Sequence, residues 1–329
     1  MVFAGHAACA TESTVRLDAI KARGHVMCGI SNGQAGFSEL RDRGAWTGLE
    51  IDFCHALAAA VLGDRNAVKL VPVSAPDRMR ALKGAEVDVL ARGAPWTLSR
   101  ETELGIRLAG VLFFDGHGFL VRRTQMVASA LELSGASLCM LKNTANEQRV
   151  LQFFRARGMR VQLVTSERWE NLVKQYGAEK CAALVGDLSV LALERSHAAD
   201  PADHLILPEL IGSEARGPMV RQGDEQWLAI VRWTLMALIG AEELGISSVN
   251  AETMRASQLP DVRRFLGLEA NIGQPLGLKP DWAYQLVKQV GNYGELYERS
   301  LGVRSSLRLE RGLNALWSKG GLMYAAPLR

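Results

Sequence analysis

Short apolar runs alternate with amphipathic stretches in the first third of the chain. The runs that predict strands lie at residues 26–28, 68–71, 87–90, 111–114 and 118–121. Between them, Leu49, Phe53 and Leu57 recur at helical spacing in a stretch that Thr47 can cap, and Ser74 opens a shorter helix. Strands that alternate with helices predict an α/β fold with a parallel-rich sheet.

The same alternation restarts after about residue 122. Strands are predicted at 137–141, 161–164 and 181–185, and helices at 147–157, 167–176 and 188–195. This segment spans roughly 95 residues, which is a normal size for a small domain. A second α/β unit is therefore expected here.

After Gly217 the chain becomes mostly helical. A long helix begins at Asp224, carries Trp227 on its apolar face, and ends near Leu244, where Gly245 is a good stop. The rest of the chain, to Arg329, is predicted to be a helical extension with many glycine turns.

The length and the crossing segments together predict two lobes. The chain has 329 residues, which exceeds the ~250–300 at which a single core usually stops growing. Segments 118–122 and 217–221 look like strands rather than flexible linkers, so we expect hinge strands. The predicted division places 17–120 and 218–329 in lobe 1, 121–217 in lobe 2, and 1–16 outside both.

Composition and charge exclude several partners. Hydrophobic residues make up 48% of the chain and charged residues 22%, as in ordinary globular proteins. The net charge of +3 gives no electrostatic case for nucleic acid or an anionic membrane as the main partner. No run of ~18 apolar residues occurs, so no membrane span is predicted.

Two interpretations of residues 1–16 are open. The stretch Ala8-Cys9-Ala10 before Thr11 resembles the cleavage region of a secretory signal, although a basic start is missing. The alternative is a disordered, alanine-rich terminus. If the signal interpretation holds, Cys9 is removed with it and four of the five cysteines remain.

One motif typical of an enzyme occurs, at Gly29–Gly33, which matches the G-x-S-x-G pattern around a nucleophilic serine. That pattern needs a helix directly after Ser31, but the next predicted helix begins only near Thr47, so we interpret the match as accidental. The scattered histidines and the lack of a C-x2-C pair predict no metal site. No nucleotide-binding motif is present, and neither a cofactor nor a catalytic residue is predicted.

Two charged residues suit the capture of a small ligand. Arg100 follows a strand and a short turn, and an arginine at a cleft can clamp a carboxylate. Asp187 follows an apolar strand at the edge where ligands bind in open α/β folds, and it can hold an ammonium group. The plainer alternatives are a solvated surface arginine and a helix cap.

The stretch 142–147 lies at the start of a helix in the second unit. Thr144 or Asn146 can cap that helix, and the free backbone N–H groups beside Lys142 can also hold an anion. Taken in isolation, these residues favour capping over ligand binding.

Several longer stretches carry a resemblance to a known family. They include Trp46-Thr47-Gly48-Leu49-Glu50-Ile51-Asp52-Phe53-Cys54, Gly84 to Leu90, Trp96-Thr97-Leu98-Ser99-Arg100, Gly223 to Trp227, Ala241 to Gly245, Asp281 to Glu295 and Arg311 to Trp317. In these stretches the chain resembles the periplasmic solute-binding proteins of polar amino-acid ABC transporters. Within them it is most similar to the general L-amino-acid binding proteins, over about 17–329.

The resemblance implies a two-lobed type II periplasmic binding protein in which each lobe is a sheet flanked by helices. It implies that the lobes close on a ligand, that Arg100 pairs with its α-carboxylate, and that Asp187 holds its α-ammonium. Thr144 matches a ligand-binding hydroxyl, and Trp96 and Asn143 lie in the same two matching loops. The resemblance also implies a monomer that delivers its ligand to the membrane permease of an ABC transporter.

The same resemblance implies two disulfides. Cys28 with Cys54, and Cys139 with Cys181, lie where this subgroup carries cysteines. One bond within each lobe is consistent with an oxidising periplasm.

Departures from the family pattern suggest an altered specificity. The usual Asn-Thr-Thr before the tryptophan is Gly93-Ala94-Pro95 here, and Pro95 lacks a backbone N–H. The usual Gly-Thr-Thr-Thr-Glu loop is Asn143-Thr144-Ala145-Asn146-Glu147, and Met79 replaces an aromatic residue. The charge pair is kept while neutral hydrogen-bond donors are lost.

Two alternatives belong to other functional classes. A periplasmic enzyme on the same fold, similar to cyclohexadienyl dehydratase, needs a carboxyl general acid with a raised pKa. The recognised motifs offer only Asp187, which has another role in the family. A module that presents its ligand to a sensor or chemoreceptor is not distinguished from a transport protein by the sequence.

Overall fold

The computed structural model describes residues 15–329, apart from the side chains of Arg43 and Ala145. Most of the predicted signal remnant, residues 1–14, lies outside the described residues. Val15 and Arg16, which the sequence grouped with that remnant, belong to the first helix, α1 (Val15–Arg23). Leu17 and Ile20 of this helix are buried, which explains why the helix begins before residue 17.

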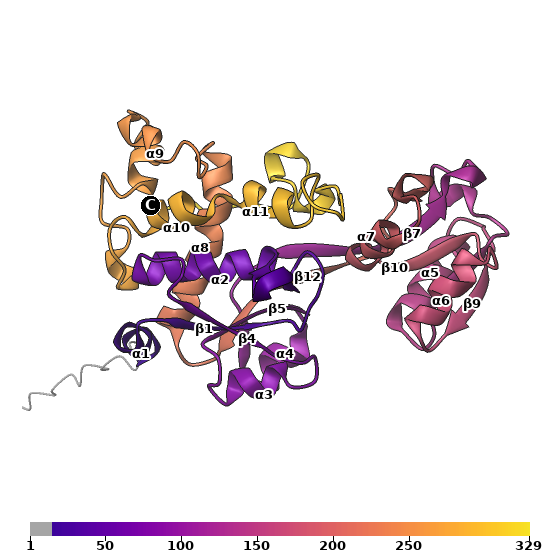
Figure 1. The fold of residues 1–329 in the computed structure, drawn as a ribbon, viewed down its shortest axis with the longest axis horizontal. Helices are drawn as coiled ribbons and strands as arrows, with labels where there is room; N and C mark the ends of the chain where they lie inside the picture. Colours follow the sequence, from indigo (N-terminus) through magenta and orange to yellow (C-terminus); the bar gives the residue numbers. More distant parts are fainter. Residues whose placement is uncertain (1–14) are drawn as a thin grey trace, which may run out of the picture. The chain divides into compact units, whose positions relative to one another are not determined.

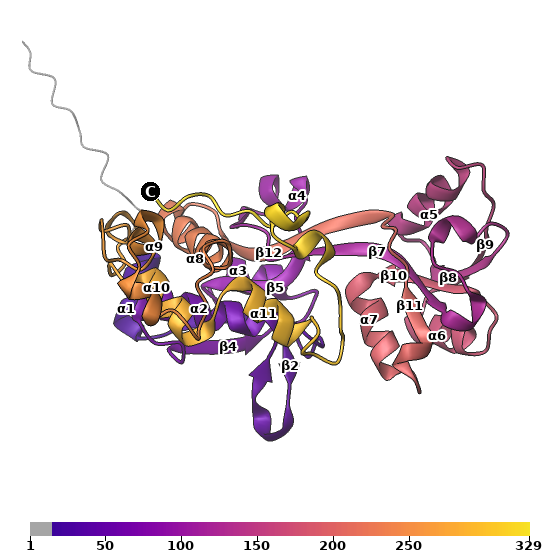
Figure 2. The same cartoon turned by 90° about the horizontal axis from the view of Figure 1, so that it is seen from above.

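The chain divides into two compact units (Figures 1 and 2). Unit 1 contains the chain through Leu112, Gly217–Leu296 and Ala315–Arg329, and unit 2 contains Phe113–Arg216 and Tyr297–Asn314. The chain therefore passes between the units at four points. The sequence placed 297–314 with lobe 1, whereas in the structure this segment packs with unit 2.

Unit 1 contains a parallel three-stranded core with helices on both of its faces. Strand β1 (Val26–Ile30) pairs in parallel with β4 (Val68–Pro72) on one side and with β5 (Val89–Pro95) on the other. Its helices in this part of the chain are α2 (Leu49–Leu62), α3 (Arg78–Lys83) and α4 (Leu98–Thr102). Figure 1 shows α2 and α3 on opposite sides of the sheet.

The C-terminal part of the chain is mainly helical, as predicted. Its helices are α8 (Glu225–Glu243), α9 (Pro260–Phe265), α10 (Trp282–Val290) and α11 (Tyr293–Ser300). Trp282 and Tyr293 are fully buried, and α10 packs closely along α2. The apolar faces of these helices thus complete the core of unit 1.

Unit 2 is a second sheet flanked by helices. Its strands are β7 (Phe113–Arg122), β8 (Ser137–Leu141), β9 (Gln162–Ser166), β10 (Ala183–Asp187), β11 (His204–Ile206) and the first half of β12 (Gly212–Arg221). Its helices are α5 (Ala145–Arg155), α6 (Trp169–Gly177) and α7 (Leu188–His197). Strand β10 is antiparallel to β7 and parallel to β8. Phe119 and Phe154 meet edge to face in the core, with ring centroids 5.8 Å apart.

Segments 118–122 and 217–221 are both strands, as predicted, but 118–122 lies within unit 2, and of these two strands only β12 passes from one unit to the other. The second half of β12 belongs to unit 1, where it pairs antiparallel with β6 (Ile106–Leu108). In unit 2, residues 212–216 pair antiparallel with residues 113–117.

The expectation of two separate strands at 111–114 and 118–121 is wrong, because Phe113–Arg122 is one continuous strand. Asp115, His117 and the glycine between them interrupt the apolar pattern, but both polar side chains are buried and have hydrogen-bond partners.

The predicted cap of α2 is also wrong. Thr47 lies in the short strand β3 (Trp46–Thr47), which pairs with β2 (Glu39–Leu40), and the helix begins at Leu49. Gly48 occupies the cap position with φ of 127°, a conformation that L side chains rarely adopt. The sequence predicted a hydroxyl cap at Thr47, whereas the backbone turn at position 48 requires glycine.

Both predicted disulfides are present. Cys28 of β1 is bonded to Cys54 of α2, and Cys139 of β8 is bonded to Cys181, with Cα–Cα distances of 6.0 and 5.7 Å. Each bond lies within one unit and ties a central strand to a neighbouring segment. In the part of the chain that the structure describes, no helix has the length and apolar character needed to cross a membrane.

Removal of the unit 2 disulfide tests its contribution to stability. Because the bond closes a loop with a sequence separation of 42 residues, the double variant Cys139→Ala/Cys181→Ala should lose about 2–4 kcal/mol of unfolding free energy. Urea unfolding under oxidising conditions measures the loss, and a reductant should destabilise the native protein more than the variant. Equal stability of the two proteins would contradict a structural role.

Candidate functional site

The β-sheet register of unit 2 places five charged or titratable side chains on one face. Asp187 at the end of β10 lies opposite His117 of β7. Glu214 of β12 lies opposite Asp115 of β7, and Arg216 follows two residues later on the same face. Because side chains alternate between the two faces of a strand, this register brings the whole set together.

Arg216 is the centre of this polar network. Its guanidinium lies 3.0 Å from the Asp115 carboxylate, 2.9 Å from that of Asp187 and 3.3 Å from that of Glu214. The buried Asp115 also accepts hydrogen bonds from the backbone N–H and the hydroxyl of Ser189, at 3.2 and 2.6 Å. Three carboxylates therefore share one buried guanidinium.

The pKa values of the two aspartates move in opposite directions. Burial raises the pKa of Asp115 to about 6, and the negative charge of Asp187 adds to this effect, although Arg216 and Ser189 oppose it. Burial also acts to raise the pKa of Asp187, but the hydrogen bond from His117 and the charge of Arg216 outweigh it, so the pKa is lowered. Asp187 is thus held as a carboxylate.

His117 and Asn146 extend the network toward α5. The Nδ1 atom of His117 lies 3.1 Å from the Asp187 carboxylate and 3.1 Å from the side-chain nitrogen of Asn146. Arg149 donates to the Asn146 side-chain oxygen at 3.1 Å. Three carboxylates face Arg216 and the more distant Arg149, so carboxylates outnumber guanidinium groups in the network. An added cationic group near Asp187 is electrostatically favoured.

The loop before α5 is ordered by its own hydrogen bonds. Thr144 stands at the cap position, but its hydroxyl donates to the carbonyl of Leu141 at 3.2 Å and makes no cap hydrogen bond. The backbone N–H of Asn143, a residue with φ of 59°, donates instead to Glu147 at 3.1 Å. Neither predicted capping side chain therefore caps the helix, because the Asn146 amide lies against His117 and Arg149.

In unit 1, Arg100 lies in the short helix α4 and is half-buried. Its guanidinium donates to the carbonyl of Pro95, which ties it to the end of β5. Trp96 is 53% exposed, and Met79 of α3 packs partly buried against a cluster that includes Leu82 and Leu90. Trp96 thus offers an accessible aromatic face close in sequence to Arg100, while Met79 is packed on one side and partly accessible to solvent.

Glu50 is a positioning residue that the sequence did not single out. Its buried carboxylate accepts hydrogen bonds from the backbone N–H of Ser31 at 3.3 Å, from the hydroxyls of Ser31 and Ser38, and from the N–H of Gly93 at 2.7 Å. It therefore connects the end of β1, the following loop and the end of β5. The available signal was a carboxylate in the first turn of a mainly apolar helix, a feature that Glu50 shares with Asp52.

The contacts of Glu50 also argue against a nucleophilic role for Ser31 in the enzyme-like motif. The Ser31 hydroxyl donates to Glu50, and the next α-helix begins only at Leu49, so the G-x-S-x-G match is accidental, as we interpreted it. Asp115 has the raised pKa that a general acid needs, but it is only 1% exposed and is paired with Arg216. Among the described residues, no group of three His, Cys, Asp or Glu side chains is placed to hold a metal ion.

The chain as a whole matches a known family. The family model of bacterial extracellular solute-binding proteins, family 3, matches residues 26–245, and the chain belongs to this family. This confirms the resemblance and the two-lobed α/β fold inferred from the sequence.

Individual relatives match over almost the full length. The general L-amino acid-binding periplasmic protein AapJ of Rhizobium johnstonii is 45% identical over 96% of this chain and 94% of its own. The glutamate/glutamine/aspartate/asparagine-binding protein BztA of Rhodobacter capsulatus is 43% identical over 98% of this chain and 95% of its own. A solved periplasmic binding protein from Brucella ovis with glutathione bound is 44% identical, with a TM-score of 0.81 over 97% of this chain and 100% of its own.

The role of Glu50 is testable by an isosteric change. Glu50→Gln replaces one acceptor oxygen with a donor amide, so a buried N–H or hydroxyl loses its partner, and unfolding free energy should fall by about 1–3 kcal/mol. Urea unfolding measures the change, with Glu103→Gln at an exposed position of unit 1 as the matched control. Equal effects of the two substitutions would show that the contacts of Glu50 do not matter.

Asp115 gives a prediction about pH. Because its folded pKa of about 6 lies above the ordinary value of 3.8, the folded state binds the proton more tightly than the unfolded state. The stability of the native protein relative to Asp115→Asn should therefore fall by about 2.4 kcal/mol as the pH rises from about 4 to 7. Urea unfolding of both proteins at a series of pH values measures this difference. A difference that rises with pH over this range would contradict the raised pKa.

Proposed function

We propose that this chain binds a small zwitterionic ligand, an L-amino acid, in the periplasm and delivers it to the permease of an ABC importer. The observation that carries the proposal is the Asp187 network, in which Asp187 is held as a carboxylate and shares Arg216 with two further carboxylates. Family membership and the names of the full-length relatives support the same ligand class.

The proposed roles of the two charged residues are complementary. Asp187 of unit 2 accepts hydrogen bonds from the ligand's α-ammonium and shares its charge with Arg216. Arg100 of unit 1 pairs with the α-carboxylate through its guanidinium group. Thr144, Asn143 and Trp96 supply further contacts in the proposed site, and Met79 a more adaptable wall.

The altered loops bear on specificity. Gly93, Ala94 and Pro95 offer no side-chain hydroxyl, so a ligand gains few neutral hydrogen bonds from the end of β5. The charge pair then supplies most of the binding energy, which favours a broad range of ligands. Glutathione, bound by the relative from Brucella ovis, also carries an amino-acid head group with an α-ammonium and an α-carboxylate. The proposed ligand class therefore includes larger molecules that carry such a head group.

The disulfides and the family support the proposed compartment and partner of this protein. The two disulfides suit an oxidising compartment, which supports a periplasmic location. The buried state of Asp115 and the ionised state of Asp187 favour binding over acid catalysis. We propose a monomer, with the ABC permease as its membrane partner.

A ligand screen followed by mutagenesis tests the proposal. A thermal-shift screen of the common L-amino acids and glutathione identifies a stabilising ligand, whose affinity is then measured by calorimetry. Arg100→Gln and Asp187→Asn should each weaken binding by about 10–100-fold, because each removes a hydrogen bond to a charged group.

Arg168→Gln is the matched control, since Arg168 is exposed and lies outside the proposed site. Circular dichroism of each variant checks that it is folded. Unchanged affinity in both Arg100→Gln and Asp187→Asn would refute the assignment of the site.

A further inference from the structure

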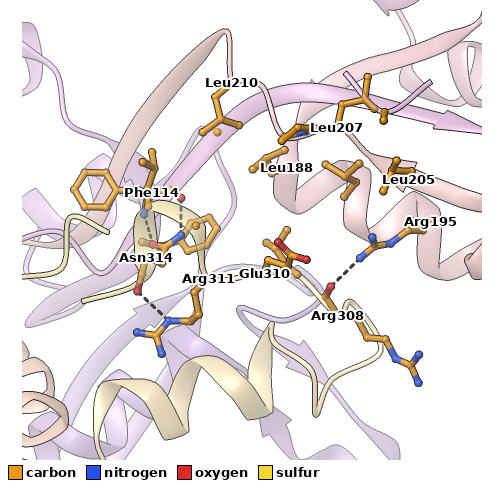
Figure 3. A pocket seen from close by; sticks show the side chains of 18 of the residues that line it. Phe114, Leu188, Arg195, Leu205, Leu207, Leu210, Arg308, Glu310, Arg311 and Asn314 are labelled. Carbon is orange, nitrogen blue, oxygen red and sulfur yellow. Dashed lines mark hydrogen bonds between the residues drawn. The ribbon is translucent and has the colours of Figure 1, made fainter. Parts of the chain in front are cut away.

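Unit 2 contains a cavity that none of the proposed ligand residues lines. It has a volume of about 430 Å³, within the range of ~300–1,000 Å³ that is typical of small-molecule sites. Strands β7 and β11 and helix α7 form one side, and segment 308–314 forms the other (Figure 3). All lining residues belong to unit 2, so the cavity is a property of this unit alone.

One wall of the cavity is apolar. Leu188, Leu205, Leu207 and Leu210 lie together on the side of the sheet and α7, as Figure 3 shows. Leu207 is buried, whereas the other three remain partly accessible to solvent. Accessible leucines inside a concave site favour contact with an apolar group of a ligand.

Arginine side chains give the cavity a cationic part beside its apolar wall. Arg195 donates through Nη2 to the carbonyls of Leu307 and Arg308, at 2.8 and 2.9 Å, which fixes the guanidinium at the cavity wall. Arg123 is anchored in the same way, by a 2.8 Å hydrogen bond to the carbonyl of Ala202. Neither arginine forms a salt bridge with any residue that the structure describes.

Cationic side chains outnumber acidic ones in the lining of the cavity. Burial lowers the pKa of Arg195, and repulsion from Arg123 and Arg308 lowers it further, while Glu310 opposes the effect. Glu310 is the only acidic residue of the lining, against four arginines. An anion beside Arg195 would relieve this repulsion.

We propose that the cavity binds a small monocarboxylate with an aliphatic chain. The carboxylate pairs with Arg195 and Arg123, whose planar guanidinium groups match its geometry, and the chain lies against the leucines. Glu310 disfavours a second negative charge, which selects a monoanion over a phosphate dianion or a dicarboxylate. This site is independent of the proposed amino-acid site, because Arg100, Asp187 and Thr144 do not line the cavity.

Methyl NMR of leucine-labelled protein tests the proposal, with octanoate as the probe. Octanoate should shift the methyl resonances of Leu188, Leu205 and Leu210 in a saturable manner. Octanamide, which has the same chain without the charge, should bind at least about 10-fold more weakly. A saturating amino acid at the other site should leave the octanoate titration unchanged.

Variants separate a charge effect from a structural one. Arg195→Gln and Arg123→Gln should each weaken octanoate binding by about 10-fold or more, while Arg168→Gln at an exposed position of unit 2 should not. Arg123→Gln keeps the two hydrogen bonds that Arg195 makes to the carbonyls of Leu307 and Arg308, so it serves if Arg195→Gln fails to fold. Equal binding of octanoate and octanamide, shifts confined to leucines outside the cavity, or no saturable shift would overturn the proposal.

Discussion

The structure of unit 2 depends on one shared guanidinium. Arg216 holds Asp115, Asp187 and Glu214 within salt-bridge distance, and without it the buried Asp115 would be an uncompensated charge. Since Asp115 also binds Ser189 at the start of α7, the network fixes the junction of β10 with that helix. The position and the charge of Asp187 both follow from this arrangement.

In unit 1 a buried carboxylate is likewise held by several partners, which here are neutral hydrogen-bond donors. The carboxylate of Glu50 gathers N–H and hydroxyl groups from Ser31, Ser38 and Gly93, and so holds the end of β5 in place. Arg100 is in turn linked to that strand end through the carbonyl of Pro95. In both units a buried carboxylate therefore holds the backbone next to a proposed ligand residue. The position of that ligand residue is set by these buried hydrogen bonds.

The sequence predicted the α/β alternation, the hinge strands and both disulfides, because apolar periodicity and family motifs are local signals. It did not reveal Arg216 or Glu50, since their importance comes from strand register and from contacts between residues far apart in the chain. Asp115 and His117 even gave a false break in β7, because their partners lie on β10, β12 and α7. The packing of segment 297–314 with unit 2 has no sequence signal of its own.

The central claim is that Asp187 recognises the ligand's ammonium group, and a comparison of two ligands in two proteins tests it most directly. Calorimetry measures the affinity of the tightest-binding L-amino acid and of the same molecule without its α-ammonium, in the native protein and in Asp187→Asn. The loss of the ammonium should weaken binding by about 10–100-fold in the native protein and by less than about 3-fold in the variant. An equal loss in both proteins would show that Asp187 does not contact the ammonium.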